Sequence, residues 1–141
     1  AQVAPPNAAA RATTAPDPHG MGVAISSLGM FARRSGKVAF TLLSHLLEDD
    51  ERVEVVVVGR FLGEDGAAAV TNRRVVLVND REWKPDVATI PFEPGVTVQG
   101  WADDRSATLA FQHGGRQVVI DQIGDRELAQ RMATIVRSRC G

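Results

Sequence analysis

Two pairs of neighbouring polar residues have types that could carry out catalysis. Asp103 and Asp104 could act as paired carboxylates, and Ser44 and His45 could act as nucleophile and base. Adjacent acids beside an arginine and a serine are, however, typical of a turn. Consecutive residues of a helix point about 100° apart, so Ser44 and His45 would not face one another. We therefore predict no catalytic residues and a protein that is not an enzyme.

Residues of the types that hold metals or phosphates are present but are poorly spaced. No two of the histidines His19, His45 and His113 are spaced to share one face, and the single cysteine, Cys140, excludes a multi-cysteine metal site. The glycines of "GRFLGEDG" lack the lysine and hydroxyl of a phosphate-binding loop, so they indicate turns. We expect no metal and no cofactor.

Two adjacent arginines, Arg73 and Arg74, interrupt the apolar stretch "GAAAVTNRRVVLV". They could contact an anion or an acidic peptide. The simpler interpretation is a turn at Asn72 between strands 67–71 and 73–78, with one guanidinium bridging to a nearby carboxylate. We favour the turn.

The composition is that of an ordinary globular domain, with 44% hydrophobic residues, 23% charged residues and a net charge of -1. This balance disfavours a nucleic-acid partner, which needs a cationic surface. The apolar stretches are shorter than the roughly 20 residues of a membrane span. The single cysteine fits a reducing interior, so we expect a cytoplasmic protein, although the first residue, Ala1, leaves a cleaved leader as an alternative.

The pattern along the chain predicts three parts. Residues 1–20 form an alanine- and proline-rich tail or linker. Residues 21–47 form a basic amphipathic helical segment, with a helix from about 37 to 48 and a weaker or kinked helix before Gly36. Residues 48–139 form the main domain.

The main domain has the pattern of strands followed by one helix. About seven short β-branched or alternating segments are separated by turn residues, which predicts antiparallel hairpins. The last segment places Leu128, Met132, Ile135 and Val136 on one helical face, and Asp125 is a suitable N-cap. The expected fold class is α+β, mainly β: a small barrel whose open mouth is plugged by the C-terminal helix.

Three segments of this domain resemble the bacterial pleckstrin-homology-like (PH-like) domains of the YokE-like group. The segments are "GAAAVTNRRVVLV", "ATIPFEPGVTV" and "ATLAFQHGGRQVVI", followed by the amphipathic helix. The resemblance covers about residues 48–139 and implies a bent seven-stranded antiparallel barrel capped by the C-terminal helix, here with an added N-terminal helix. It also implies a scaffold that mostly binds partners. Eukaryotic relatives often bind phosphoinositides through a basic first loop, but here Arg60 faces two acids in "RFLGEDGA", so we expect no such cradle.

Our first functional hypothesis is a non-enzymatic module that binds a protein, a peptide or further copies of itself, as a homo-oligomer. The proposed route is the open edge between the fifth strand and the C-terminal helix, where an extended peptide can add to the sheet. Of the two tryptophans, we expect one in the core and one on a binding surface. The candidate partner-binding residues are Val96, Val98, Trp101, Leu128 and Arg131.

Our second hypothesis is a peripheral membrane protein anchored by the N-terminal helical segment. This segment has three cationic residues and no acid, so it could make weak contact with an anionic membrane. The alternative is that its apolar side chains pack on the barrel or on another subunit. The candidate membrane or subunit contacts are Ile25, Leu28, Phe31, Arg33, Arg34 and Lys37.

Overall fold

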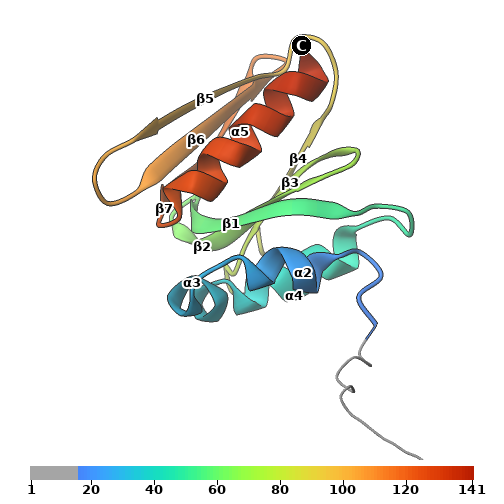
Figure 1. Ribbon diagram of the computed structural model, residues 1–141, viewed down its shortest axis with the longest axis vertical. Coiled ribbons are helices and arrows are strands. Elements are labelled where there is room, and N and C mark those ends of the chain that lie inside the picture. Colours follow the sequence, from blue (N-terminus) through green and yellow to red (C-terminus); the bar gives the residue numbers. More distant parts are fainter. Residues whose placement is uncertain (1–15) are drawn as a thin grey trace, which may run out of the picture.

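The computed structural model describes residues 16–141 and contains a bent β-sheet with helices on two sides (Figure 1). Three short helices precede the sheet: α2 (Met21–Ser26), α3 (Met30–Ser35) and α4 (Lys37–Leu46). The strands are β1 (Val53–Phe61), β2 (Glu64–Thr71), β3 (Arg74–Asn79), β4 (Val87–Pro91), β5 (Thr97–Ala102), β6 (Ala107–His113) and β7 (Arg116–Ile123). One long helix, α5 (Arg126–Cys140), follows them.

The seven strands form one antiparallel sheet in the order β4-β3-β2-β1-β7-β6-β5. Its bend is sharp at the end of β1, which pairs with β2 on one side and with β7 on the other. Glycine at position 59 permits the close approach of β1 to β7, because a Cβ atom there would lie 2.3 Å from the Asp121 carbonyl oxygen. Within residues 16–141 no ladder joins β4 to β5, so the barrel is open between these strands. The predicted fold class is confirmed, with an open rather than a closed sheet.

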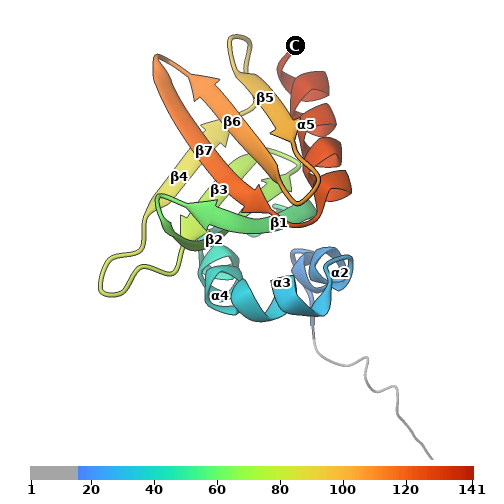
Figure 2. The same cartoon turned by 90° about the vertical axis from the view of Figure 1, so that its left-hand side faces the viewer.

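Helix α5 covers the interior of the bent sheet (Figure 2). Its buried face consists of Ala129, Met132, Ala133 and Val136, which pack against the inward-facing side chains of the strands. The predicted N-cap is confirmed, because the Asp125 carboxylate accepts a hydrogen bond of 3.0 Å from the Leu128 N–H.

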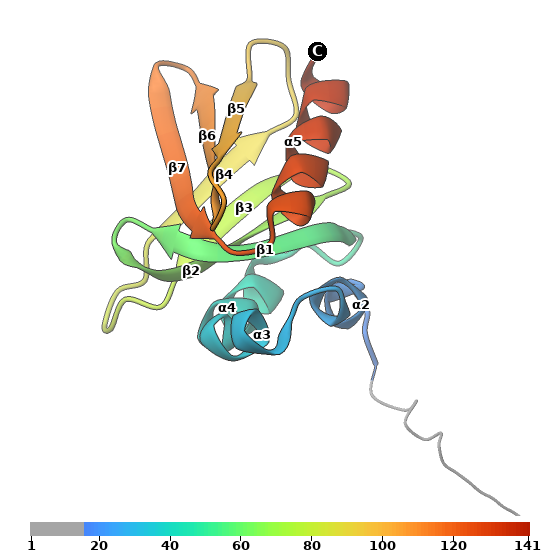
Figure 3. The same ribbon diagram turned by 60° about the vertical axis from the view of Figure 1, so that its left-hand side comes forward.

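The three N-terminal helices cover the opposite, outer face of β1–β3 (Figure 3). Val55 and Val57 of β1 point into the barrel, whereas Val56 and Val58 pack against the helices. Both faces of these strands are therefore buried, which explains why their sequences are unbroken apolar runs rather than alternating ones. Residues 37–47 therefore pack on the barrel, which is one of the arrangements expected for the apolar side chains of the helical segment.

The helical segment contains three short helices where one helix and a weaker one were expected. The additional break lies between α2 and α3, whereas the junction of α3 and α4 is at Gly36, as expected. Gly36 lies close to the sheet, since a Cβ there would lie 2.6 Å from Phe40 Cζ and 2.8 Å from Val58 Cγ2. Before α2, the His19 carbonyl accepts a hydrogen bond of 2.8 Å from the Val53 N–H. The expected tail at residues 1–15 lies outside the described residues.

Candidate partner-binding groove

Strand β5 is an edge strand whose outer main-chain groups face α5. Arg137 Nη2 donates a hydrogen bond of 3.2 Å to the Val98 carbonyl, so this carbonyl points away from β6. In an antiparallel pair these directions alternate, and the main-chain groups of Gly100 and Ala102 therefore point the same way. In the described part of the chain, neither residue makes a hydrogen bond outside the β5–β6 ladder. The end of β5 thus offers unpaired donors and acceptors.

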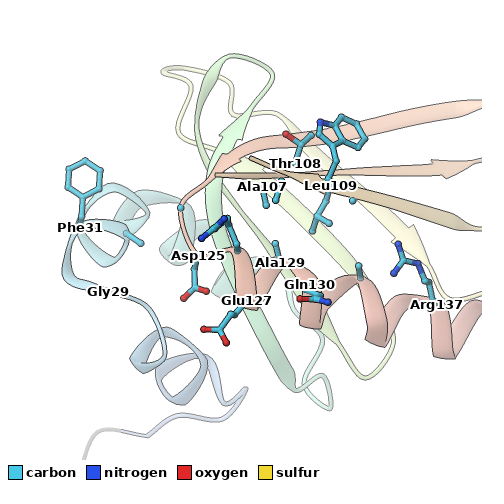
Figure 4. A pocket seen from close by; sticks show the side chains of 17 residues that line it. Gly29, Phe31, Ala107, Thr108, Leu109, Asp125, Glu127, Ala129, Gln130 and Arg137 are labelled. Carbon is cyan, nitrogen blue, oxygen red and sulfur yellow. The ribbon is translucent and has the colours of Figure 1, made fainter. Parts of the chain in front are cut away.

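These main-chain groups open into a groove of about 980 Å³ between β5, β6, α5 and the start of α3 (Figure 4). Small side chains on facing positions leave this space: Gly100 and Ala102 on β5, Ala129 and Ala133 on α5. Arg126 at the start of α5 donates a hydrogen bond of 2.8 Å to the Asp103 carbonyl, which fixes the helix to the β5–β6 turn. The groove is therefore held open by the fold.

Aromatic and acidic side chains give the groove its chemical character. Phe31 from α3 is 85% exposed and Trp101 from β5 is 57% exposed, although both line the groove. Asp125 and Glu127 lie at the N-terminal end of α5 on the same groove (Figure 4). This combination suits a segment with an apolar side chain to anchor and main-chain groups to pair.

The five predicted partner-binding residues have different positions around the groove. Trp101 lines it, but Val96 and Val98 are buried in the core, and Val98 contributes only its main chain to this edge. Leu128 is half-buried between the barrel and the helical layer, and Arg131 is exposed on α5; neither lines the groove. Sequence reasoning missed Thr108 and Gln130, which line it and carry no recognisable motif.

The two tryptophans depart from the expectation that one belongs to the core. Trp83 is 101% exposed on the β3–β4 loop, with a positive φ of 69°, and Trp101 is also exposed. The expected core tryptophan is wrong, because the interior is filled by aliphatic side chains together with Phe61, Phe111 and Met132.

The predicted membrane or subunit contacts are divided between surface and interior. Leu28 is 3% exposed, and Ile25 is half-buried; both pack in the core between the helical layer and β1–β3. The expectation that Leu28 contacts a membrane or a subunit is therefore wrong, because its side chain is not accessible. Arg33 is held by the chain itself, donating to the Leu28 carbonyl at 2.9 Å and the Ser26 carbonyl at 3.0 Å. Phe31, Arg34 and Lys37 are exposed.

Arg73 and Arg74 lie at the β2–β3 turn and contact carboxylates of the chain itself. Arg74 Nη2 and Nε bond to the two Glu51 carboxylate oxygens at 2.8 and 2.9 Å, and Arg73 pairs with Asp50. Burial raises the pKa of Glu51, but the hydrogen bonds from Arg74, the Glu48 N–H and Thr71 outweigh it and hold this pKa at about 2. The turn interpretation, with a bridging guanidinium, is the one observed.

The adjacent acids Asp103 and Asp104 are part of the β5–β6 turn. The Asp103 carboxylate accepts hydrogen bonds from the main-chain N–H groups of Arg105 and Ser106, at 2.7 and 2.9 Å. These two bonds lower the pKa of Asp103. Its carboxylate is thus engaged in fixing the turn.

A second cavity, of about 630 Å³, lies at the end of the barrel formed by the β1–β2 turn, β4 and β7. Its lining has two arginines, Arg60 and Arg116, and two acids, Asp86 and Asp121. Arg60 also pairs with Asp65 at 3.5 Å. This balance of charge does not favour a multiply charged anion.

The described residues contain no group of three or more histidine, cysteine, aspartate or glutamate side chains that could hold a metal ion. Among the helices of residues 16–141, none is long and apolar enough to cross a membrane.

Comparison with known proteins finds similarity only to solved structures. No model of a known protein family matches the chain, and no curated protein matches it. A pleckstrin homology domain from Shewanella amazonensis SB2B is 18% identical, with 74% of this chain and 96% of that chain covered and a TM-score of 0.47. A DUF1696 family protein with a pleckstrin-homology domain from Shewanella loihica PV-4 is 16% identical, with coverages of 74% and 95% and a TM-score of 0.46.

These similarities concern the fold alone. The observed architecture, a bent seven-stranded antiparallel sheet with a C-terminal helix, is the one that the resemblance to bacterial PH-like domains implied.

Proposed function

We propose that this protein is a non-enzymatic interaction module that binds an extended segment of a partner protein along β5. The observation that carries the proposal is the pair of unpaired main-chain positions, Gly100 and Ala102, facing an open groove. An extended peptide that pairs with an edge strand gains main-chain hydrogen bonds whatever its sequence, and pockets beside the strand give it specificity.

The groove supports this proposal by its size and its side chains. Its volume of about 980 Å³ can hold several side chains of a bound segment. Exposed aromatic residues such as Phe31 and Trp101 are typical anchors of protein interfaces. Helix α5 does not occupy the outer main-chain groups of Gly100 and Ala102. Within the described residues, its side chains donate hydrogen bonds along this edge only to the carbonyls of Val98 and Asp103.

The proposal is tested by removing one main-chain donor. Proline at an outward-facing position of an edge strand deletes an N–H without breaking the existing ladder. Ala102→Pro does this in β5. Thr89→Pro is the matched control on β4, the other edge strand. The Asp86 carbonyl accepts a hydrogen bond from the Asn79 N–H, next to β3, and main-chain directions alternate along a strand. The N–H of Thr89, three residues later, therefore points outward.

The probe is a displayed library of random 12-residue peptides panned on the full chain. We expect enriched peptides that bind the parent protein and Thr89→Pro equally but bind Ala102→Pro and Trp101→Ala at least tenfold more weakly. A library without enriched peptides, or equal binding by Ala102→Pro and the parent, would refute the proposal. A second copy of this chain could also be the partner, and light scattering of the chain alone tests this by measuring its mass. A dimer that is lost in Ala102→Pro would identify a second copy as the partner.

A further inference from the structure

The side of the helical layer that faces away from the barrel carries exposed large apolar side chains. Met30 is 76% exposed and Val38 54%, whereas Phe40 and Leu43 of the same layer are buried against the sheet. Phe31, which is 85% exposed, lies at the margin of this side, where it also lines the groove. Exposed apolar side chains that gather in one patch are typical of an interaction surface.

These apolar residues and two cations lie on one continuous helical face. Hydrogen bonds from the Gly36 N–H to the Ala32 carbonyl and from the Phe40 N–H to the Gly36 carbonyl, both 2.9 Å, continue the helical pattern from α3 into α4. Residues spaced by three and four positions therefore share a face across the junction. We name as the α3 face Met30, Phe31, Arg34, Lys37 and Val38.

The charge of this face is entirely positive. Residues 18–47 contain no aspartate or glutamate. Arg33 is engaged with the carbonyls of Ser26 and Leu28, but Arg34 and Lys37 have no ion-pair partner in the described part of the chain. Two acids at the N-terminal end of α5, Asp125 and Glu127, share the lining of the groove with Phe31.

We propose that the α3 face binds the surface of an anionic lipid bilayer. Exposed Met30 and Phe31 would enter the boundary between headgroups and acyl chains, while Arg34 and Lys37 would remain among the anionic headgroups. The helical layer lies on the outer side of β1–β3, opposite the barrel interior, so the strands do not cover its outer surface (Figure 3). This inference does not depend on the groove or on its partner.

The test is flotation of the full chain with vesicles of phosphatidylcholine alone or with 30 mol% phosphatidylserine, a composition chosen as roughly that of an anionic leaflet. We expect binding to the anionic vesicles only. Each cation near the surface contributes about fivefold in affinity, so Arg34→Gln with Lys37→Gln should weaken binding about 25-fold. Phe31→Ser should weaken it about tenfold, because a partly inserted ring is lost.

Matched controls separate this surface from general charge and aromatic effects. Arg105→Gln with Arg116→Gln removes the same charge from two exposed hairpin residues, and Trp83→Ser removes the most exposed aromatic side chain elsewhere. Both controls should bind like the parent. The proposal is overturned if the parent does not bind anionic vesicles, or if the controls lose as much binding as the α3 variants. It is also overturned if Phe31→Ser lowers the mass of the chain in solution without lipid, which would assign the face to a protein contact.

Discussion

Glu51 is a buried carboxylate that ties three segments of the chain together. Its oxygens accept hydrogen bonds from the Glu48 N–H at 3.0 Å, from Thr71 Oγ1 at 2.7 Å and from Arg74. Arg74 also donates to the Leu46 carbonyl at the end of α4, at 2.9 Å. One ionised side chain therefore adds a polar link to the apolar packing between the helical layer and the sheet.

The charge of Glu51 should make stability depend on acid pH. Its pKa falls from an ordinary 4.5 to about 2 on folding, so its contribution is complete above pH 4.5 and is lost as the pH falls toward 2. The free energy of unfolding should drop by about 2 kcal/mol between pH 7 and pH 3 from this group alone. Urea unfolding at both pH values measures it. Glu51→Gln should be less stable than the parent at pH 7 and should lose less stability on acidification. Glu82→Gln, at an exposed position, is the control and should behave like the parent. The same pH dependence for the parent and Glu51→Gln would contradict this account.

At the scale of an element, the α3–α4 junction depends on a glycine that touches the sheet. A methyl group at Gly36 would meet Phe40 and Val58 at less than 3 Å, so Gly36→Ala should destabilise the protein by about 1–3 kcal/mol. Gly29→Ala is the control, because no atom lies within 4 Å of a Cβ placed there. Urea unfolding compares the two variants, and an equal stability for both would mean that the junction adjusts freely.

The elements differ in how far the sequence determines them. Helix α5 and strands β1–β3 could be predicted because their periodicity reflects burial on one face or on both, and Asp125 is a local cap. The start of α4 after Gly36 could also be predicted, but the break between α2 and α3 could not, and neither could the close contact of Gly36 with Val58, in a strand distant in sequence. The same limit applies to the groove: β5 could be identified as an edge, but Phe31 reaches it from about seventy residues away.

At the scale of the whole molecule, the helical layer and the barrel share strands β1–β3. Leu43 of α4 is fully buried against their outer face, so Leu43→Ala should lower the free energy of unfolding by about 2–5 kcal/mol. Because both cores use the same strands, we expect one unfolding transition, with tryptophan fluorescence and far-ultraviolet circular dichroism changing together. Leu46→Ala, at a partly exposed position, should have a smaller effect. Separate transitions for the two signals would mean that the helical layer unfolds alone.

Phe31 belongs both to the α3 face and to the lining of the groove. One ring cannot be inserted among lipids and also cover a bound peptide in the same position. Under the two proposals, lipid and peptide would thus be thermodynamically linked: whichever is bound first changes the dissociation constant of the other, and by reciprocity the factor is the same in both directions. Through a single phenyl group, the affinity of one site would then depend on whether the other site is occupied.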